Sequence, residues 1–406
     1  MSHYDAKETQ APEQRAAAVF DELRERLRSI VAAPAWADKL AGVDPATVTN
    51  AAALAALPIT RKSELMDAQR AAPPFGGFLP EGTAVARMFV SPGPVFVPQG
   101  FEADPFNTAR ALYAAGVRRG DVVVNTFGYH ATPGAFILES GLAALGCTIF
   151  AIGPGKADEA LPTIAASGAT VYCGVPDYLN ILLDRAEAAG TPLPLRHALV
   201  SGAALPPDLR ARIEGRGVTV LQCYATADLG VIAYESDARE GLIVNEDVIL
   251  EIVRPGTGDP VAEGEVGEVV VTGLNPTYPL IRFATGDLSA VLPGPSPCGR
   301  TNTRIKGWMG RADQRTKVKG MFVDPAQIAE VRRRHPEIAA ARLVVDRADH
   351  TDTMTLLVDG PEEASFSGIA ATLKAVTNLT GSVAAAPPGG LPNDGKVIAD
   401  ERPVAG

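Results

Sequence analysis

The sequence predicts an α/β protein with a large N-terminal domain and a small, mobile α+β C-terminal domain. Between residues 121 and 224, short apolar runs alternate with helical stretches, which is the pattern of βαβ units in a mostly parallel sheet. Beyond residue 240, apolar runs are separated by Gly and Pro turns without helices, which indicates a small antiparallel β subdomain. The last segment begins near residue 310 with clustered Arg and Lys residues and then alternates strand and helix patterns.

The N-terminal residues are expected to be helical. On residues 12–32, Val19, Leu23 and Leu27 recur at helical spacing and give one apolar face. Residues 33–60 are rich in Ala and Pro, and we expect helices broken by turns there.

The middle of the chain contains the expected parallel sheet. We expect strands at 121–125, 147–152, 170–173, 197–201 and 218–224, with helices at 135–145, 156–167, 177–189 and 206–214. Ligands of such sheets bind beyond the carboxyl ends of the strands. The loops that follow these strands are therefore expected to carry the functional site.

The antiparallel strands are expected at 248–253, 267–272 and 279–283. The segment after residue 310 is expected to order its elements as β-α-β-α-β. We therefore expect two domains, residues 1–309 and residues 310–406.

Composition excludes some classes of function. The 37 basic and 47 acidic residues give a net charge of −10, which argues against a nucleic-acid partner. The longest apolar stretch, 134–152, is interrupted by Glu139 and ends in strand-forming residues, so we expect a helix and a strand there and no membrane span. Four separated cysteines without a CxxC pair fit a reducing cytoplasm.

Several motifs carry a resemblance to a known family. They are Leu57-Pro-Ile-Thr-Arg-Lys-Ser-Glu-Leu65, Ser201-Gly-Ala-Ala-Leu-Pro206, Tyr278-Pro-Leu-Ile-Arg-Phe-Ala-Thr-Gly-Asp287, Cys298-Gly-Arg-Thr301 and the run from Gly310-Arg-Ala-Asp313 to Ile328. In order and spacing they resemble the adenylate-forming superfamily, and most closely the phenylacetate–CoA ligase family. The run from 278 to 328 is the specific part.

The resemblance implies an activity and its cofactors. A ligase of this kind activates an aryl or related small carboxylic acid with ATP and Mg²⁺, forms an acyl-adenylate, and transfers the acyl group to coenzyme A with release of AMP. Residues 1–309 would hold the nucleotide and acyl pocket, and residues 310–406 would be a mobile lid. A homodimer is what the resemblance suggests.

Four positions match residues that serve this chemistry in the family. Asp287 matches the aspartate that accepts hydrogen bonds from both ribose hydroxyls, and Arg311 matches an arginine near the nucleotide. Asp313 matches the hinge between the two domains. Lys396 matches the catalytic lysine whose ammonium stabilises charge on the reacting phosphate. The alternative roles are an ordinary turn aspartate for Asp287, a surface linker around Asp313 and a solvated surface lysine for Lys396.

Two further segments match the nucleotide pocket. Tyr224 would stack near the adenine, Thr226 would offer its hydroxyl to the α-phosphate, and Asp228 replaces the usual Glu as the Mg²⁺ ligand. Because Asp is one methylene shorter, the metal must shift, bind through water or be absent; a helix cap is the alternative role. Ala203 and Ala204 replace the family's Ala-Glu pair and would make the pocket wider or less polar.

The phosphate-binding loop departs from the family. The family's Ser-Ser-Gly-Thr-Thr-Gly-Lys-Pro is replaced by residues 90–98, in which only Ser91 and Gly93 are retained. Pro92 and Pro94 have no backbone N–H to offer a phosphate. We therefore expect weaker binding of a triphosphate, with less effect on AMP.

The segment after residue 125 is expected to form the acyl pocket. Phe127, Tyr129 and Phe136 could wall a flat slot suited to an aryl group. His130 would orient a carboxylate or a ring hydroxyl, or be an ordinary loop histidine.

The residues leave two alternative functions open. The acyl acceptor could be a carrier-protein thiol instead of coenzyme A. The abnormal phosphate loop is also typical of a degenerate, non-catalytic protein that binds an aryl acid or AMP.

Overall fold

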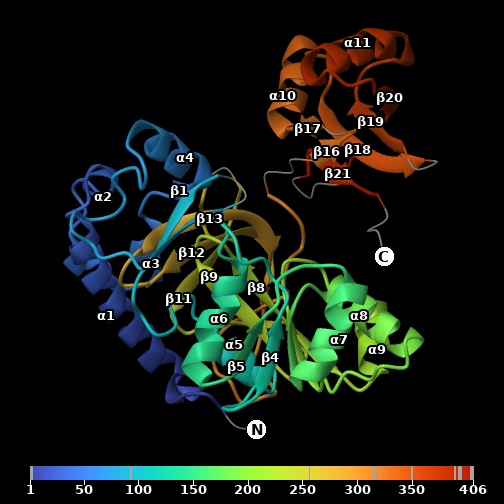
Figure 1. The fold of residues 1–406 in the computed structure, drawn as a ribbon. Coiled ribbons are helices and arrows are strands. Elements are labelled where there is room, and N and C mark those ends of the chain that lie inside the picture. The colour runs from blue at the N-terminus through green and yellow to red at the C-terminus, as the bar shows by residue number, and fades with distance from the viewer. Residues whose placement is uncertain are drawn as a thin grey trace. The chain divides into compact units, whose positions relative to one another are not determined.

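The computed structural model describes residues 3–91, 94–255, 257–312, 316–319, 321–348, 351–387, 390–391 and 396–402. The chain falls into two compact units, Met1–Met309 and Gly310–Gly406 (Figure 1). In the part of the chain that the structure describes, no helix is long and apolar enough to cross a membrane.

The largest sheet of the first unit has nine strands in the order β14-β15-β10-β9-β8-β7-β6-β4-β5. Its parallel half comprises β4 (Val122–Asn125), β5 (Thr148–Ala151), β6 (Val171–Gly174), β7 (His197–Val200) and β8 (Thr219–Thr226). An antiparallel half continues it with β9 (Gly230–Glu235), β10 (Leu242–Val244), β14 (Val291–Leu292) and β15 (Arg304–Ile305). The α/β fold class is therefore confirmed, and the carboxyl end of β8 lies where the sheet changes direction.

Helices cover both faces of the parallel half. Val123 packs with α5 (Ala109–Ala114) and α6 (Gly134–Leu145), whereas its neighbour Val124 packs with α7 (Ala157–Ser167) and α8 (Pro176–Ala188). Successive side chains of a strand point to opposite faces, so an unbroken Val run means burial on both sides. The last crossover helix of this half is α9 (Pro207–Glu214).

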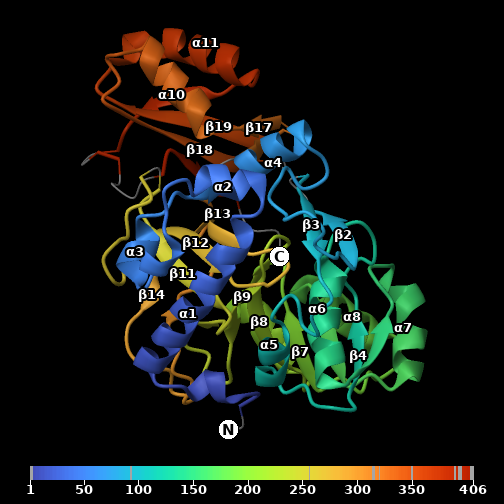
Figure 2. The ribbon, with the colours of Figure 1, turned by 90° about the vertical axis from the view of Figure 1, so that its left-hand side faces the viewer.

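A second sheet of four strands has the order β1-β13-β12-β11. The strands are β1 (Thr60–Arg61), β11 (Val248–Val253), β12 (Gly267–Gly273) and β13 (Leu280–Ser289). The N-terminal helices, which are α1 (Pro12–Ile30), α2 (Pro34–Lys39), α3 (Ala51–Ala55) and α4 (Lys62–Ala71), bury their apolar residues against it. A separate hairpin, β2 (Arg87–Val90) with β3 (Phe96–Gln99), lies beside α4 (Figure 2).

Strand β13 corrects one boundary of the sequence prediction, which ended this strand at residue 283. In the structure it continues to Ser289, because Leu288 and Ser289 pair with Glu268 and Gly267 of β12 beyond a register shift that spans residues 285–287. Arg282 has φ 45° and lies in a second register shift of the same strand. Its guanidinium is buried and donates to Glu251 and to the carbonyl oxygens of Ala55 and Leu57.

The second unit contains a four-stranded sheet in the order β20-β19-β18-β21 and a separate hairpin. Its elements are β16 (Thr316–Val318), β17 (Met321–Val323), α10 (Pro325–Arg334), β18 (Ala340–Ala348), β19 (Thr351–Asp359), α11 (Phe366–Thr377), β20 (Ser382–Ala385) and β21 (Ile398–Asp400). The expected β-α-β-α-β order is wrong, because two hairpins, β16–β17 and β18–β19, stand where single strands were expected. Both strands of a hairpin have similar alternating patterns, so the sequence did not separate them.

Candidate nucleotide site

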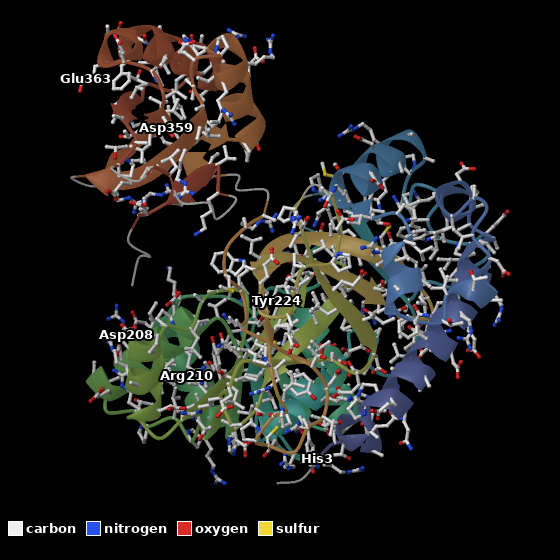
Figure 3. The ribbon with its side chains drawn as sticks, turned by 180° about the vertical axis from the view of Figure 1, so that it is seen from behind. His3, Asp208, Arg210, Tyr224, Asp359 and Glu363 are labelled. Atoms are coloured by element: carbon white, nitrogen blue, oxygen red, sulfur yellow. The ribbon has the colours of Figure 1, made fainter. Side chains whose placement is uncertain are left out.

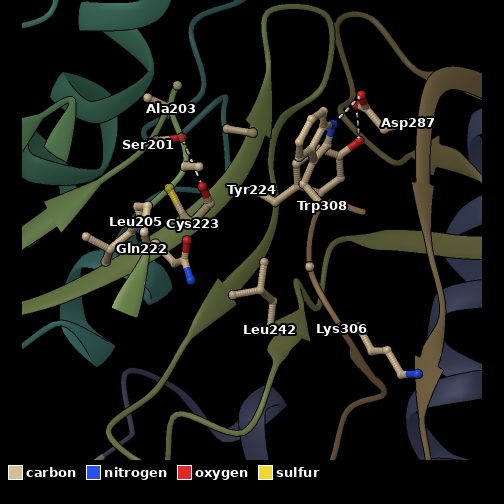
Figure 4. Close-up of a pocket in the computed structure, with 15 residues that line it drawn as sticks. Ser201, Ala203, Leu205, Gln222, Cys223, Tyr224, Leu242, Asp287, Lys306 and Trp308 are labelled. Atoms are coloured by element: carbon tan, nitrogen blue, oxygen red, sulfur yellow. Dashed lines mark hydrogen bonds between the residues drawn. The ribbon is translucent and has the colours of Figure 1, made fainter. Parts of the chain in front are cut away.

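The first unit contains a cavity of about 550 Å³ at the carboxyl ends of β7 and β8. Residues after β7, the end of β8, β13 and the segment before residue 310 line it (Figure 4). The lining residues are Ser201, Gly202, Ala203, Ala204, Leu205, Pro206, Gln222, Cys223, Tyr224, Ala225, Leu242, Asp287, Lys306, Gly307 and Trp308. Figure 3 shows Tyr224 inside the first unit, among these strands.

Asp287 is the acidic residue of this cavity, and two aromatic side chains hold its carboxylate. The Tyr224 hydroxyl donates to Oδ2 at 2.6 Å, and the indole Nε1 of Trp308 donates to Oδ1 at 3.0 Å (Figure 4). Asp287 itself is only 7 % exposed. A carboxylate has about four lone-pair positions, so this type of group suits a ligand that brings two hydroxyl donors.

Small residues and a fixed turn form the opposite wall. The Ser201 hydroxyl donates to the Cys223 carbonyl at 2.9 Å and so ties the loop after β7 to β8. Gly202 has φ +79°, and a Cβ placed there would lie 3.5 Å from the Phe127 ring. Ala203 adds only a methyl group. The wall is therefore mostly backbone, which leaves room for a flat group beside Tyr224.

This geometry suits a nucleoside. A buried carboxylate is the natural acceptor for the two hydroxyls of a ribose. An aromatic side chain next to a flat backbone wall suits a purine. Of the residues expected to bind nucleotide, Tyr224, Ala203, Ala204 and Asp287 come together here.

Ser91 and the hairpin that carries it have a different arrangement. The Ser91 N–H donates to the Val95 carbonyl at 2.8 Å, and the Val95 N–H donates to the Ser91 hydroxyl oxygen at 3.3 Å. Both residues are buried. Gln69 of α4 adds a two-point clamp, since its amide accepts from the Phe96 N–H at 2.7 Å and donates to the Phe96 carbonyl at 2.9 Å. Gly93 lies outside the described residues.

Thr226 and Asp228 do not line the nucleotide cavity among its described residues. The Thr226 hydroxyl accepts from the Leu229 N–H at 3.2 Å, which closes the turn after β8. Asp228 Oδ2 contacts the Lys62 ammonium at 3.0 Å. A carboxylate already neutralised by an ammonium does not fit the role of a Mg²⁺ ligand.

The aromatic residues expected in the acyl pocket separate into two places. Phe127 abuts the wall of the nucleotide cavity at Gly202. Tyr129 and Phe136 pack edge to face, with ring centroids 5.4 Å apart, and Phe136 continues onto Phe89 of β2 at 5.0 Å. His130 is exposed, and its Nδ1 lies 3.4 Å from the Thr132 hydroxyl. Tyr129, His130 and Phe136 are absent from the described lining of the nucleotide cavity.

Burial raises the pKa of the Tyr129 hydroxyl, and the charge of Glu139 raises it further. The Asn125 amide donates to this hydroxyl at 3.0 Å. Tyr129 is therefore a neutral, oriented hydrogen-bonding group beside the Phe136 ring at neutral pH.

Arg311 and Lys396 belong to the second unit. Both are exposed. Lys396 comes just before β21, and its carbonyl accepts from the Arg342 Nε at 3.0 Å, which fixes the backbone at this point. Asp313 lies outside the described residues.

Sequence reasoning missed Trp308, Lys62 and Gln69. Trp308 is one of only two tryptophans in the chain and stands two positions before Gly310, where the second unit begins. Lys62 belongs to the motif that begins at Leu57, but no role was assigned to it. The signal from Gln69 is weak, because a helical glutamine is usually a surface residue.

Comparisons with known proteins agree with the geometry. Residues 106–277 match the AMP-binding enzyme family. The chain is 30 % identical over 341 residues to a phenylacetate–coenzyme A ligase of Aromatoleum evansii, covering 80 % of this chain and 76 % of that protein. It is 31 % identical over 327 residues to a phenylacetate–coenzyme A ligase of Thermus thermophilus, covering 77 % and 73 %.

A solved structure shows the same fold. The 2-hydroxyisobutyryl-CoA ligase in complex with 2-HIB-AMP and CoA matches with a TM-score of 0.72, over 98 % of this chain and 91 % of that one. Only 22 % of the residues are identical, so this match describes the fold alone.

Proposed function

We propose, from the premise that this chain belongs to the phenylacetate–coenzyme A ligase family, that its substrate is an aryl or related small carboxylic acid. Ligases of this family are adenylate-forming enzymes that use coenzyme A. The acid oxygen attacks the α-phosphate of ATP, pyrophosphate leaves, and an acyl-adenylate forms. The thiolate sulfur of coenzyme A then attacks the acyl carbonyl, and AMP leaves.

The observation that carries this proposal is the carboxylate of Asp287, held by Tyr224 and Trp308 at the edge of the cavity. Asp287 accepts the ribose hydroxyls, and Tyr224 forms one wall of the adenine slot. Ala203 and Ala204 form the other wall. Binding of the nucleoside part therefore needs no group from the altered hairpin at residues 90–98.

Lys396 supplies positive charge during adenylation. A cation that reaches the α-phosphate only in the reacting arrangement stabilises the transition state more than the bound substrates, and this is what raises the rate. Arg311 binds near the nucleotide, and Asp313 is the hinge about which the second unit turns between the two half-reactions.

The acyl group binds on the side of Phe127. Its ring already packs against the cavity wall at Gly202, so an aryl group placed there would lie beside the nucleotide cavity. Tyr129, Phe136 and His130 lie on the same segment and on α6. They supply aromatic surface and a polar group for selecting the acid.

A pyrophosphate-exchange assay with a panel of aryl and small aliphatic acids tests the proposal. We expect exchange with at least one aryl acid, and AMP release when coenzyme A is added. A phosphopantetheine-bearing carrier protein in place of coenzyme A tests the other acceptor. Absence of exchange with every acid would refute the ligase proposal.

The closed hairpin at Ser91 favours a second candidate, a protein that binds AMP and an aryl acid without turnover. Ser91 and Val95 use hydrogen-bonding groups on each other that a phosphate would otherwise need. Calorimetry separates the two functions: AMP binding together with neither exchange nor product would establish the binding protein.

A further inference from the structure

A partly buried ion pair lies near the end of β8 and joins two segments that are far apart in the sequence. Lys62 is the first residue of α4, directly after β1, and Asp228 follows the end of β8. The Lys62 ammonium lies 3.0 Å from Asp228 Oδ2, and the side chains are 34 % and 5 % exposed. The pair therefore connects the N-terminal helices to the strand that carries Tyr224.

Asp228 faces a small space of its own. It lines a small cavity of about 20 Å³ together with Tyr278 and Asn275, and the described linings of the two cavities have no residue in common. Oδ1 of Asp228 and the hydroxyl of Tyr278 are buried and have no hydrogen-bond partner among the described residues. Burial and the charge of Asp228 raise the pKa of the Tyr278 hydroxyl, so it remains a proton donor.

The volume of this cavity decides what it can hold. One water molecule needs about 10–15 Å³ of such volume, so there is room for one water. A hydrated Mg²⁺ needs six oxygen ligands in octahedral geometry, which is far larger. Within the described part of the chain, no cluster of three or more His, Cys, Asp or Glu residues could hold a metal ion.

We propose that Lys62 is a built-in counter-ion that neutralises Asp228 in place of a divalent cation, and that one water joins Asp228 Oδ1 to the Tyr278 hydroxyl. This inference rests on the proposed function, because it is the resemblance to the family that places a Mg²⁺ ligand at Asp228. Any divalent cation in the reaction is then bound by the phosphates of ATP. Asp228 keeps a positioning role, because its ion pair fixes the end of β8 against α4.

A thermal-unfolding cycle tests the counter-ion directly and requires no activity. In Lys62→Met the Asp228 charge is left buried and unpaired, and we expect the unfolding temperature to fall by roughly 5–10 °C. Lys62→Arg restores a cation and should recover most of that loss. The double variant Lys62→Met/Asp228→Asn should be more stable than Lys62→Met alone. Additive shifts in the cycle, or no rescue by Lys62→Arg, would overturn the proposal.

Binding of Mn²⁺, followed by electron paramagnetic resonance, tests the metal. We expect Asp228→Asn to bind Mn²⁺ with the same affinity as the wild type, within about threefold, both without nucleotide and with ATP. Asp67→Asn, an exposed carboxylate on α4, is the matched control. A tenfold loss of Mn²⁺ affinity in Asp228→Asn, with its fold intact, would make Asp228 a metal ligand after all.

These results are independent of the ligase assay. If no acid supports pyrophosphate exchange in any variant, the proposed function fails, yet the unfolding cycle still decides whether Lys62 and Asp228 are coupled.

Discussion

The two carboxylates near the end of β8 occupy contrasting environments. Asp287 receives hydrogen bonds from the neutral donors of Tyr224 and Trp308 and lines a cavity of about 550 Å³. Asp228 is paired with a cation and lines a space of about 20 Å³. The larger cavity leaves room for a ligand beside Asp287, whereas the ammonium of Lys62 occupies one oxygen of Asp228 and its space has room for about one water. Asp287 is therefore placed to meet a ligand, and Asp228 mainly holds the structure together.

A second contrast is found in the backbone. The loop at Gly202 leaves a flat open wall, whereas Ser91 and Val95 of the hairpin hydrogen-bond to each other. The nucleoside end of the site therefore has an open wall, and Ser91 already has an internal partner. Four variants test this difference.

Asp287→Ala should give the largest effect. It removes the acceptor of two ribose hydroxyls, and hydrogen bonds to charged groups contribute about 1.5–3 kcal/mol each, so AMP affinity should fall by roughly 10²–10⁴-fold. Calorimetry with AMP measures the loss. Asp67→Ala, which removes an exposed carboxylate of α4, should bind AMP like the wild type. Unchanged AMP affinity in Asp287→Ala would contradict the assignment of this cavity to the nucleoside.

Lys396→Ala should have the second-largest effect, and on the rate of pyrophosphate exchange. Loss of one charged group that stabilises the transition state should lower pyrophosphate exchange by roughly 10²–10³-fold. AMP affinity should stay within about twofold, because the nucleoside contacts are on the first unit. Lys374→Ala, an exposed lysine of α11 in the same unit, is the control. Equal losses of exchange and of AMP affinity would indicate that Lys396 binds the ground state instead.

Gln69→Leu tests the closed hairpin. Its two hydrogen bonds to Phe96 would be lost and a partly buried N–H and carbonyl left without this partner, which should lower the free energy of unfolding by about 1–3 kcal/mol. The affinities for AMP and ATP should change equally if the hairpin is structural. Arg70→Leu, at the exposed neighbouring position, is the control. A selective loss of ATP affinity would show that the hairpin still binds phosphates.

Local pattern was enough to predict the parallel half of the sheet. Its strands are short Val- and Leu-rich runs with helices between them, and periodicity identifies such elements without tertiary information. The resemblance to the family also implied that Tyr224, Ala203 and Asp287 serve one ligand, and the structure brings them to one cavity. The order of elements after residue 310 was missed, because hairpin strands repeat one pattern.

Contacts between distant segments could not be predicted in this way. Lys62 and Asp228 are 166 positions apart, and only the parallel pairing of β1 with β13 brings the start of α4 to this part of the unit. The Trp308 indole meets Asp287 through the irregular segment between β15 and residue 310, which has no recurring sequence signal. Side-chain partners of this kind depend on packing of the whole unit and are invisible to local periodicity.

Trp308→Phe should give the smallest effect of the four variants. It removes one neutral donor to Asp287 and keeps an aromatic ring, so AMP affinity should fall by about three- to tenfold, since one hydrogen bond contributes about 1 kcal/mol. Trp308 is 59 % exposed, whereas the other tryptophan, Trp36, is fully buried. AMP should therefore change the tryptophan emission of the wild type, and Trp308→Phe should abolish that change. A signal that persists in this variant would mean that the nucleotide does not approach the Asp287 carboxylate beside the indole, and that AMP binds elsewhere.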